Sequence, residues 1–329
     1  MYGTYPYTAT RAKAMKSLLL KKEDYEKLKK MGVSETARFL GEGQYKRQVE
    51  YMAKYHKGVR MVNLALNENL SFMINKLLMI SSKEARELIK LYSGKWVISN
   101  IKVVLRAKIN NLDKKELDEI VPIEPTTREF CLKLFSTDNP SKMVRKTIHI
   151  NSESFEKFYK EGDLKSLENL LDVTYYSSIF GASKKFPGML GTFFQNLIIL
   201  LNIKNILKLT ASGIDKKMLK DFIIGTEISL LRDTMKANST DDMIDVLKGS
   251  RYAILTKDAE KDITKLENNI EKFLYEYSFR LLHKKPISIF PIFGYLLAKE
   301  AEIRNLRLIF NAKSLGLKED FIDRNLITN

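Results

Sequence analysis

The fold of this chain is decided by PIFGYLLAKEAEIRNLRLI, Pro291 to Ile309, because part of that stretch recurs. The segment EIRNLRLI, residues 302 to 309, has a near copy in NIKNILKL, residues 202 to 209. Extended outward, this copy reads NIKNILKLTASGIDKKML, and NIKVVLRAKINNLDKKEL from residue 100 to residue 117 matches it without gaps. Starts at residues 100, 202 and 302 give a period far longer than that of common helical solenoids. The sequence therefore predicts three related helical units.

Each copy predicts the same local structure, which is an apolar helix, a short break and the start of a second helix. In the copy that begins at residue 100, Asp113 is expected to cap the second helix, with Glu116 three residues later as in a capping box. Leu112 and Leu117 flank this start as a hydrophobic staple would.

The other two copies keep this arrangement less completely. Asp215 replaces Asp113 in the second copy, between Ile214 and Leu219, but Met218 replaces the capping-box glutamate. The C-terminal copy matches at its front and needs three extra residues before Leu317. Lys318 occupies its capping position, where lysine is a poor cap.

A second element also occurs three times, in SETARFLGEGQY, KSLENLLDVTYY and DDMIDVLKGSRY. In each, a leucine is followed five residues later by a tyrosine. We expect a short helix to end near each leucine, and the tyrosine to seal the next helix against it. The three pairs are Leu40 with Tyr45, Leu171 with Tyr176, and Leu247 with Tyr252.

The composition favours an all-α protein. Only 15 glycines and 7 prolines occur in 329 residues, too few for the many turns of an all-β or α/β chain. A hydrophobic content of 44% with 29% charge predicts a folded chain, and the length favours more than one core. The net charge of +16 favours an acidic partner, although lysine-rich composition also arises from the genome or growth temperature of the source.

The sequence offers no chemistry of its own. His56, His149 and His283 are scattered, and with one cysteine they give no recognisable metal spacing. The Gly-Lys pair in SGKW, residues 93 to 96, lacks the other residues of a phosphate-binding loop. The carboxylates fit caps and solvated ion pairs better than acid–base catalysis. We therefore expect no cofactor, no metal and no catalytic residue.

The chain is expected to be cytoplasmic and to have no transmembrane segment. Its most apolar stretch, Phe193 to Ile203, is short and interrupted by polar residues, which predicts a buried helix. The N-terminus lacks the apolar core of a secretory signal, and Cys131 has no second cysteine with which to pair.

These stretches together resemble one family. PIFGYLLAKEAEIRNLRLIFNAKSLGL, YPYTATRAKAMKSLLL near the N-terminus and the three leucine-to-tyrosine elements are similar to the C subunit of the archaeal and bacterial A/V-type rotary ATPases, whose eukaryotic relative is the d subunit of the vacuolar ATPase. The resemblance covers the whole chain. Its most specific residues are Tyr295, Lys299, Glu300, Glu302, Arg304, Asn305 and Arg307. Met143 to Asp163 has no counterpart in the other repeats, and its role stays open.

The resemblance implies an all-helical funnel with three-fold pseudo-symmetry. With the repeats, it divides the chain into residues 1–95, 96–190 and 191–290 as three helical repeats, and 291–329 as C-terminal helices that close onto the first repeat. In the funnel, each repeat would supply an equivalent helix, so the recurring polar and apolar pattern has a reason.

The function implied is that of a non-catalytic member of the central stalk. It would sit at the cytoplasmic face of the membrane, join the proteolipid rotor ring to the central shaft, and transmit torque for ion transport and ATP synthesis or hydrolysis. The basic residues that would meet these partners are Arg11, Lys102, Lys204, Arg304 and Arg307, of which Lys102, Lys204 and Arg304 share one position of the aligned repeat. For these three, a salt bridge to a neighbouring helix is the alternative.

Two other functions compete with this one. A basic helical scaffold that binds nucleic acid would also carry net positive charge, but it predicts lysines and arginines gathered on one face. Here they are spread over all repeats and mixed with acidic residues, so no nucleic acid is expected. An enzyme is less well supported than either, since no catalytic motif is present.

Overall fold

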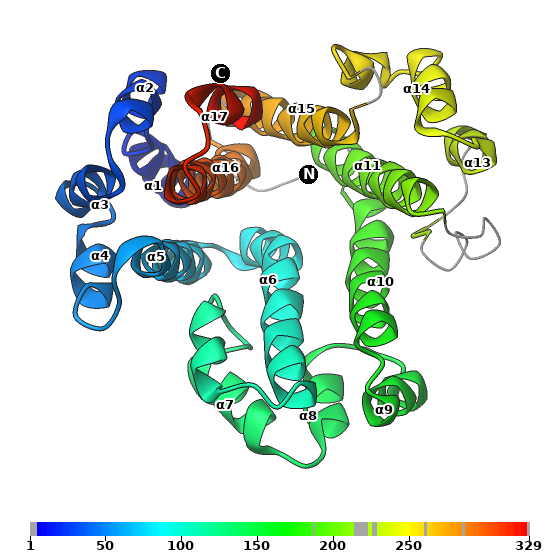
Figure 1. The fold of residues 1–329 in the computed structure, drawn as a ribbon, viewed down its shortest axis with the longest axis horizontal. Coiled ribbons are helices and arrows are strands. Elements are labelled where there is room, and N and C mark those ends of the chain that lie inside the picture. The colour runs from blue at the N-terminus through cyan, green and yellow to red at the C-terminus, as the bar shows by residue number, and fades with distance from the viewer. Residues whose placement is uncertain are drawn as a thin grey trace. The chain divides into compact units, whose positions relative to one another are not determined.

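Helices and short 3₁₀ segments form the regular secondary structure of the residues that the computed structural model describes (Figure 1). These are residues 5–186, 188–213, 223–225, 229–259, 262–284 and 287–327. No strand occurs in these ranges, where Ile123 and Thr126 form an isolated bridge. The predicted all-α class is confirmed.

The chain forms two compact units. Unit 1 consists of Met1–Leu167 and Ser278–Asn329, and unit 2 consists of Glu168–Tyr277. The division into three repeats and a C-terminal segment stays a prediction, because compact units and structural repeats are different properties of a chain.

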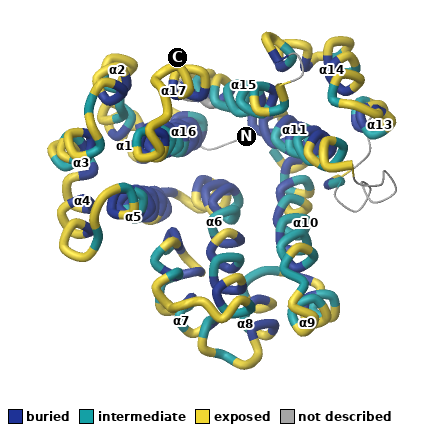
Figure 2. The backbone as a smooth tube through the Cα atoms, in the orientation of Figure 1, coloured by how far each residue is buried: buried dark blue, intermediate teal, exposed yellow. Residues whose placement is uncertain are grey.

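Unit 1 is built around the long helix α16, which packs against α1, α3, α5, α6 and α17. Figure 2 shows dark blue, buried backbone along both α16 and α5, because apolar residues lie on nearly every side of these helices. The helices of unit 1 are α1 (Pro6–Lys16), α2 (Lys22–Lys30), α3 (Val33–Glu42), α4 (Lys46–Met52), α5 (Gly58–Ile80), α6 (Lys83–Ile109), η1 (Lys114–Glu119), α7 (Arg128–Ser136), α8 (Pro140–Thr147), α9 (Ser152–Glu161), α16 (Ile289–Ser314) and α17 (Glu319–Asn325).

Unit 2 is built around α11, which contributes Leu200, Ile203, Ile206 and Leu207 to a core that α14 and Tyr252 complete. Phe193 and Phe194 of the same helix are also buried, as its apolar sequence predicts. The helices of unit 2 are α10 (Leu164–Ser183), α11 (Met189–Ala211), α13 (Ser229–Lys236), α14 (Thr240–Lys248), η3 (Ala253–Thr256) and α15 (Ile263–His283), with the unit boundaries falling inside α10 and α15.

Helix α11 is the one helix of the described residues that is long and apolar enough to cross a membrane. Length and composition are the only criteria it meets, and the core helix of a soluble protein meets them too. Its buried side chains in the core of unit 2 match the predicted buried helix.

A buried asparagine clamps a later segment of the chain in the same way at three places. Its side-chain amide donates to a backbone carbonyl at 2.6 to 2.9 Å, and its side-chain oxygen accepts from the backbone N–H of the same residue at 2.9 to 3.0 Å. The backbone N–H and C=O of the clamped residue thus both have a hydrogen-bond partner away from water. The three pairs are Asn100 with Val121, Asn202 with Ile224, and Asn305 with Ile327.

The helix that carries each clamp also ends in the same way. Eleven residues after the asparagine, Asn111, Gly213 and Gly316 take positive φ values of 52°, 67° and 67°. This left-handed conformation ends a helix and suits glycine or asparagine. In two of the three, the next N–H bonds back to the helix, from Leu112 to Ala107 and from Leu317 to Ala312.

The clamps correct the alignment of the C-terminal copy. They place Asn305, not Glu302, at the position of Asn100 and Asn202, so the three extra residues are not needed. Arg307 is then the counterpart of Lys102 and Lys204, and the assignment of Arg304 to that position is wrong. Sequence identity alone favoured the other register because Ile303-Arg304 imitates the Ile-Lys pair.

The predicted helix starts have mixed outcomes. Asp113 does cap, accepting from the Lys115 N–H at 2.8 Å, but the helix that follows is the short 3₁₀ segment η1. Lys318 precedes α17 without a side-chain cap bond, as its type predicts. Ile214, Asp215, Met218 and Leu219 lie outside the described residues.

The stretch from Met143 to Asp163 is mainly helical. It covers the second half of α8 and all of α9, whose first turn is capped by the Asn151 side chain. A left-handed Gly162 ends α9.

Candidate functional site: a buried polar cluster on helix α16

Two opposite charges lie one turn apart inside unit 1. Lys299 Nζ is 2.9 Å from Glu302 Oε1, and the two side chains are 1% and 2% exposed. They share a face of α16 because residues three apart in a helix are neighbours. Taking two charges out of water is costly, so this pair requires further partners.

Tyr45 and Gln44, from the connection between α3 and α4, supply those partners. Lys299 Nζ donates to the Tyr45 hydroxyl at 2.8 Å and to Gln44 Oε1 at 3.1 Å. The Tyr45 hydroxyl and Gln44 Nε2 donate to Glu302 Oε1 at 2.5 and 2.8 Å. We call Gln44, Tyr45, Lys299 and Glu302 the α16 cluster. All three protons of the ammonium group have an acceptor.

Burial shifts the pKa values of the α16 cluster in opposite directions. Desolvation lowers the pKa of Lys299, opposed by the charge and hydrogen bond of Glu302. Desolvation and the neighbouring Glu302 carboxylate raise the pKa of Tyr45 well above its usual value. Tyr295, also on α16, has its pKa raised by burial and by Glu302.

The α16 cluster joins the two ends of the chain within unit 1. Glu302 Oε2 accepts from the Leu20 N–H, and Gln44 Nε2 also donates to the Leu18 carbonyl. Because Lys299, Glu302 and Tyr45 are almost completely buried, they cannot reach a dissolved substrate. The arrangement fixes α16 against the N-terminal helices and offers no acid–base chemistry.

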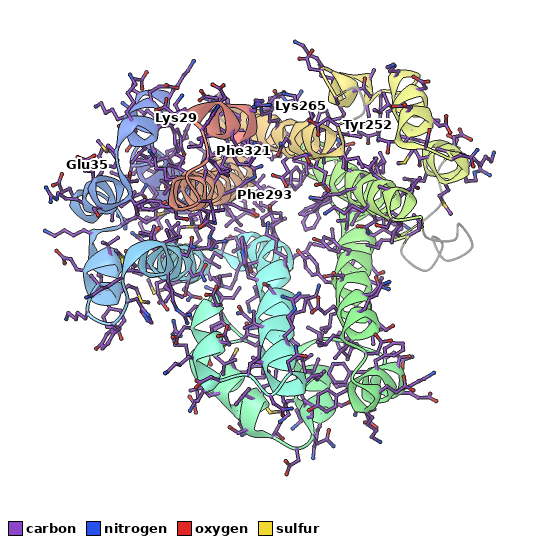
Figure 3. All side chains as sticks on the ribbon, viewed as in Figure 1. Lys29, Glu35, Tyr252, Lys265, Phe293 and Phe321 are labelled. Carbon is purple, nitrogen blue, oxygen red and sulfur yellow. The ribbon has the colours of Figure 1, made fainter. Side chains whose placement is uncertain are left out.

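A second tie joins the same two ends of the chain. Lys29 of α2 lies 2.5 Å from Asp323 of α17 and 2.7 Å from Glu26 (Figure 3). Burial lowers the pKa of Lys29, but the hydrogen bonds to both carboxylates outweigh it and raise that pKa. The ammonium group therefore stays charged and paired.

Glu300 of α16 makes a third polar contact, with two residues of α6. The Tyr92 hydroxyl donates to Glu300 Oε2 at 2.6 Å, and Lys95 forms an ion pair with Glu300. Burial lowers the pKa of Lys95, opposed by the charge of Glu300. The Tyr92 ring packs edge-on against Phe293 of α16, with centroids 5.2 Å apart; Figure 3 labels Phe293. Sequence reasoning singled out Glu300 but missed Tyr92 and Lys95, which lie about two hundred positions away.

The basic residues predicted to meet partners have different surroundings. Lys204 lies 3.7 Å from Glu267 and 3.6 Å from Glu271 of α15, which is the salt bridge to a neighbouring helix considered as the alternative. Arg304 donates to the Asn325 carbonyl at 2.9 Å, and Arg307 bonds to Asn67.

Arg11 and Lys102 complete that set. Arg11 is exposed on α1, and Lys102 is partly buried on α6. Desolvation lowers the pKa of the partly buried Arg307, opposed by the charges of Glu119 and Glu300. Arg11, Lys102, Arg304 and Arg307 belong to unit 1, and Lys204 belongs to unit 2.

The three tyrosines of the second repeated element also differ. Tyr45 and Tyr252 are buried, and each precedes a new helical segment, α4 and η3. The Tyr252 hydroxyl donates to Asn196 Oδ1 of α11 at 2.8 Å (its position is labelled in Figure 3). Asn196 and Lys299 both lie six residues before a clamp asparagine, so both tyrosines contact the same position of the repeat.

The expected helix end at Leu171 is wrong. Helix α10 continues through Leu171 and Tyr176 to Ser183. A glycine follows Leu40 and Leu247 within three residues, as Gly43 and Gly249. Three residues after Leu171 the chain has Thr174 instead, whose hydroxyl donates to the Leu170 carbonyl at 2.7 Å within the helix. Tyr176 is partly buried and lines a hollow of about 200 Å³ between α10 and α11. Leu171 itself is fully buried.

Within the described residues, no group of three or more histidine, cysteine, aspartate or glutamate side chains is placed to hold a metal ion. Cys131 is buried, and burial raises the pKa of its thiol to about 12. Such a thiol is protonated near neutral pH and a poor nucleophile.

Comparison with known proteins gives these contacts a context. Residues 8–325 match the family described as ATP synthase (C/AC39) subunit. The chain is similar to the C subunit of the A-type ATP synthase of Methanosarcina acetivorans, with 29% identity over 99% of this chain and 93% of that protein. The corresponding protein of Methanosarcina mazei is 30% identical over the same shares, and that of Haloferax volcanii is 28% identical over 99% and 98%. The match spans both units and includes all four residues of the α16 cluster, so this chain belongs to the ATP synthase (C/AC39) subunit family.

Proposed function

We propose that this chain is the central-stalk coupler that joins the membrane proteolipid rotor ring to the central shaft of an A-type ATP synthase. As a member of its family it is a non-catalytic subunit of an ion-translocating rotary complex. The finer role is mechanical: torque passes through the chain between ring and shaft.

The observation that carries this proposal is the internal bracing of unit 1. A part that transmits torque has to resist bending, and the last helices of unit 1 are tied to the first ones at two separate points. The α16 cluster makes one tie, and the pair of Lys29 with Asp323 makes the other. Close-packed interiors transmit strain, so such ties suit a part that carries a mechanical load.

The proposed shape is a three-fold pseudo-symmetric funnel. Three equivalent asparagine clamps and three equivalent helix ends support three related units, because each set repeats in local geometry. We propose residues 1–95, 96–190 and 191–290 as the repeats, with 291–329 closing onto the first. Packing of α16 against α1, α3 and α5 supports that closure.

The candidate partner contacts can be ranked by exposure. Arg11 is the best candidate because it is exposed. The other four candidates rank below Arg11 because their side chains are partly buried: Lys102, Lys204, Arg304 and Arg307. The chain would lie peripherally at the cytoplasmic face of the membrane and would bind no nucleic acid.

Capture of the tagged full-length chain from native membranes tests this role. The shaft proteins and the proteolipid ring should be recovered with it at moderate salt. Arg11→Glu should reduce that recovery, while Lys22→Glu, at another exposed basic residue of unit 1, serves as the matched charge change. Recovery of nucleic acid without any other part of the ATPase would contradict the proposal and favour the basic scaffold.

A further inference from the structure

Helix α5 carries a surface stripe of four residues, of which two, Phe72 and Met79, have large and exposed apolar side chains. Most of α5 is buried, but Phe72 is 49% and Met79 is 75% exposed. Glu68, Phe72, Asn75 and Met79 follow one another at helical spacing, so they share one face of α5. At 1.5 Å per residue, this stripe is about 16 Å long, which is three helical turns.

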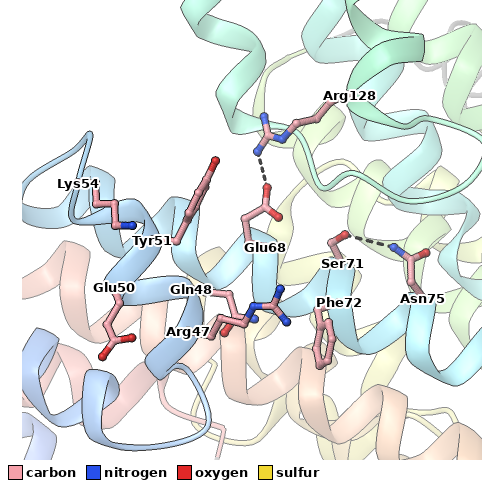
Figure 4. A pocket seen from close by; sticks show the side chains of 10 residues that line it. All are labelled: Arg47, Gln48, Glu50, Tyr51, Lys54, Glu68, Ser71, Phe72, Asn75 and Arg128. Atoms are coloured by element: carbon pink, nitrogen blue, oxygen red, sulfur yellow. Dashed lines mark hydrogen bonds and ion pairs between the residues drawn. The ribbon is translucent and has the colours of Figure 1, made fainter.

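The stripe lies between two hollows in the surface of unit 1. One, of about 880 Å³, is lined by Phe72 and by Tyr51 of α4, whose ring is 55% exposed (Figure 4). The other, of about 490 Å³, is lined by Met79 and Lys90. Asn75 lines both, so they adjoin. We call this continuous depression the α5 groove.

The acidic side chains of the first hollow are paired with cations. Glu68 forms an ion pair with Arg128 (Figure 4), and Glu50 lies 3.8 Å from Lys46. In the second hollow, Glu124 is an exposed carboxylate at the edge.

The free charge of the groove is therefore positive. Arg47 and Lys54 line the first hollow and Lys90 the second, and none of the three has an ion pair with a described residue. Lys76 adds a cation 5.8 Å from the centre of the Phe72 ring. An occupant that supplies carboxylates opposite these side chains would complement them.

The floor of the groove is held rigidly. Gln48, which lines the first hollow, accepts from Asn69 at 3.2 Å, and Asn69 also donates to the Gln44 carbonyl at 3.2 Å. Ser71 donates to the Pro122 carbonyl at 2.5 Å. Gln44 belongs to the α16 cluster, so the floor is continuous with the most tightly bonded part of unit 1. A preformed groove loses little conformational entropy on binding.

We propose that the α5 groove binds an acidic amphipathic helix of about three turns from a partner protein. Phe72 and Met79, two turns apart on α5, form the seat for the apolar side of such a helix, and the exposed Tyr51 lines the same hollow as Phe72. The unpaired cations then face its carboxylates. Nucleic acid and anionic lipid would also be attracted by these cations, but neither supplies apolar side chains spaced two helical turns apart to contact Phe72 and Met79. The groove goes beyond the coupling role, which does not require it.

A synthetic peptide tests this inference on the full chain. The probe is an 18-residue helix of Leu, Glu and Ala with its leucines on one face, and the comparison peptide has lysine in place of every glutamate. We expect fluorescence anisotropy to give a Kd for the acidic peptide at least ten times lower than for the basic one. Anionic phosphatidylglycerol vesicles and single-stranded DNA should not displace it.

Two kinds of variant separate charge from apolar contact. Arg47→Glu with Lys54→Glu should raise the Kd of the acidic peptide at least ten-fold, and Phe72→Ala should raise it about five-fold while leaving the charge unchanged. Lys22→Glu with Lys27→Glu makes the same charge change on exposed α2 residues and should alter the Kd less than two-fold. Circular dichroism checks that each variant is folded.

Three results would overturn the inference: no binding of the acidic peptide, equal binding of both peptides, or equal loss in the groove and α2 variants. None of these results bears on the coupling role, which is tested separately by capture of the tagged chain from native membranes.

Discussion

Lys299 and Glu302 form an ion pair of 2.9 Å that is almost completely withdrawn from water, and the hydroxyl of Tyr45 bonds to both of them. Tyr45 lies more than 250 positions earlier in the chain. This contact links the sequence stretch that decides the fold to the N-terminal helices, and the cost of breaking it can be measured.

Glu302→Gln leaves the Lys299 ammonium group buried without its counter-charge. Removing one partner of a buried pair costs about 3–5 kcal/mol, so we expect a loss of that size in the free energy of unfolding, measured by urea denaturation. Glu50→Gln breaks an exposed Lys-Glu pair on α4 and should cost about 0–1 kcal/mol. Equal losses in the two variants would show that the buried pair adds nothing.

The asparagine clamps predict equal effects at three distant positions. Asn100→Ala, Asn202→Ala or Asn305→Ala leaves a buried peptide group unsatisfied, which costs about 1–3 kcal/mol each. Asn205→Ala is the control, since Asn205 is the residue that the sequence alignment placed opposite Asn305 and its side chain has no hydrogen bond to a described residue. A loss at Asn205 that matches the other three would restore the alignment rejected above.

The all-α class and the buried helix α11 were predictable from the sequence, because apolar periodicity and scarce glycine and proline act locally. The register of the C-terminal copy was not predictable. It depends on a hydrogen bond from Asn305 to Ile327, while the residues around Ile303 imitate the Ile-Lys pair of the other copies.

The α16 cluster could be predicted only in part. Tyr45, Lys299 and Glu302 each stood out in the sequence, but nothing in the one-dimensional pattern joins residues from opposite ends of the chain. Gln44 was missed because a single glutamine beside a tyrosine carries no periodic signal. The helix end expected at Leu171 failed for a local reason, since no glycine follows it as one does at the other two sites.

The tyrosine variants should now fall into two classes. Tyr45→Ala and Tyr252→Ala remove fully buried rings and should cost about 3–5 kcal/mol each. Tyr176→Ala removes a partly exposed ring on a continuous helix and should cost about 1–2 kcal/mol. Urea denaturation followed by far-UV circular dichroism measures all three. A loss at Tyr176 as large as at Tyr45 would mean that the ring seals its unit after all.

Alkaline pH should weaken the α16 cluster through Tyr45. The folded-state pKa of Tyr45 is raised by burial and by Glu302, so its stabilising contribution is complete below about pH 10, the unfolded value. It is lost as the pH rises above that value, because the unfolded chain then releases the proton first. The free energy of unfolding should therefore fall more steeply in the native protein than in Tyr45→Phe as the pH rises above about 10.

Comparison with Tyr45→Phe separates the effect of Tyr45 from that of the other groups that titrate in this pH range. Lys299 has a lowered pKa, so its contribution changes with pH in the opposite sense, but it is present in both proteins. Parallel curves for the two proteins would show that Tyr45 does not carry the alkaline loss.

The central claim is that this chain couples ATP chemistry to ion movement without performing either. The most direct measurement follows ATP hydrolysis and ATP-driven ion uptake in membrane vesicles that contain the rotary complex, before and after removal of this chain and after its return. We predict that hydrolysis continues without the chain, that ion uptake stops, and that the purified chain restores uptake. Ion uptake that persists at its full rate without the chain would contradict the account.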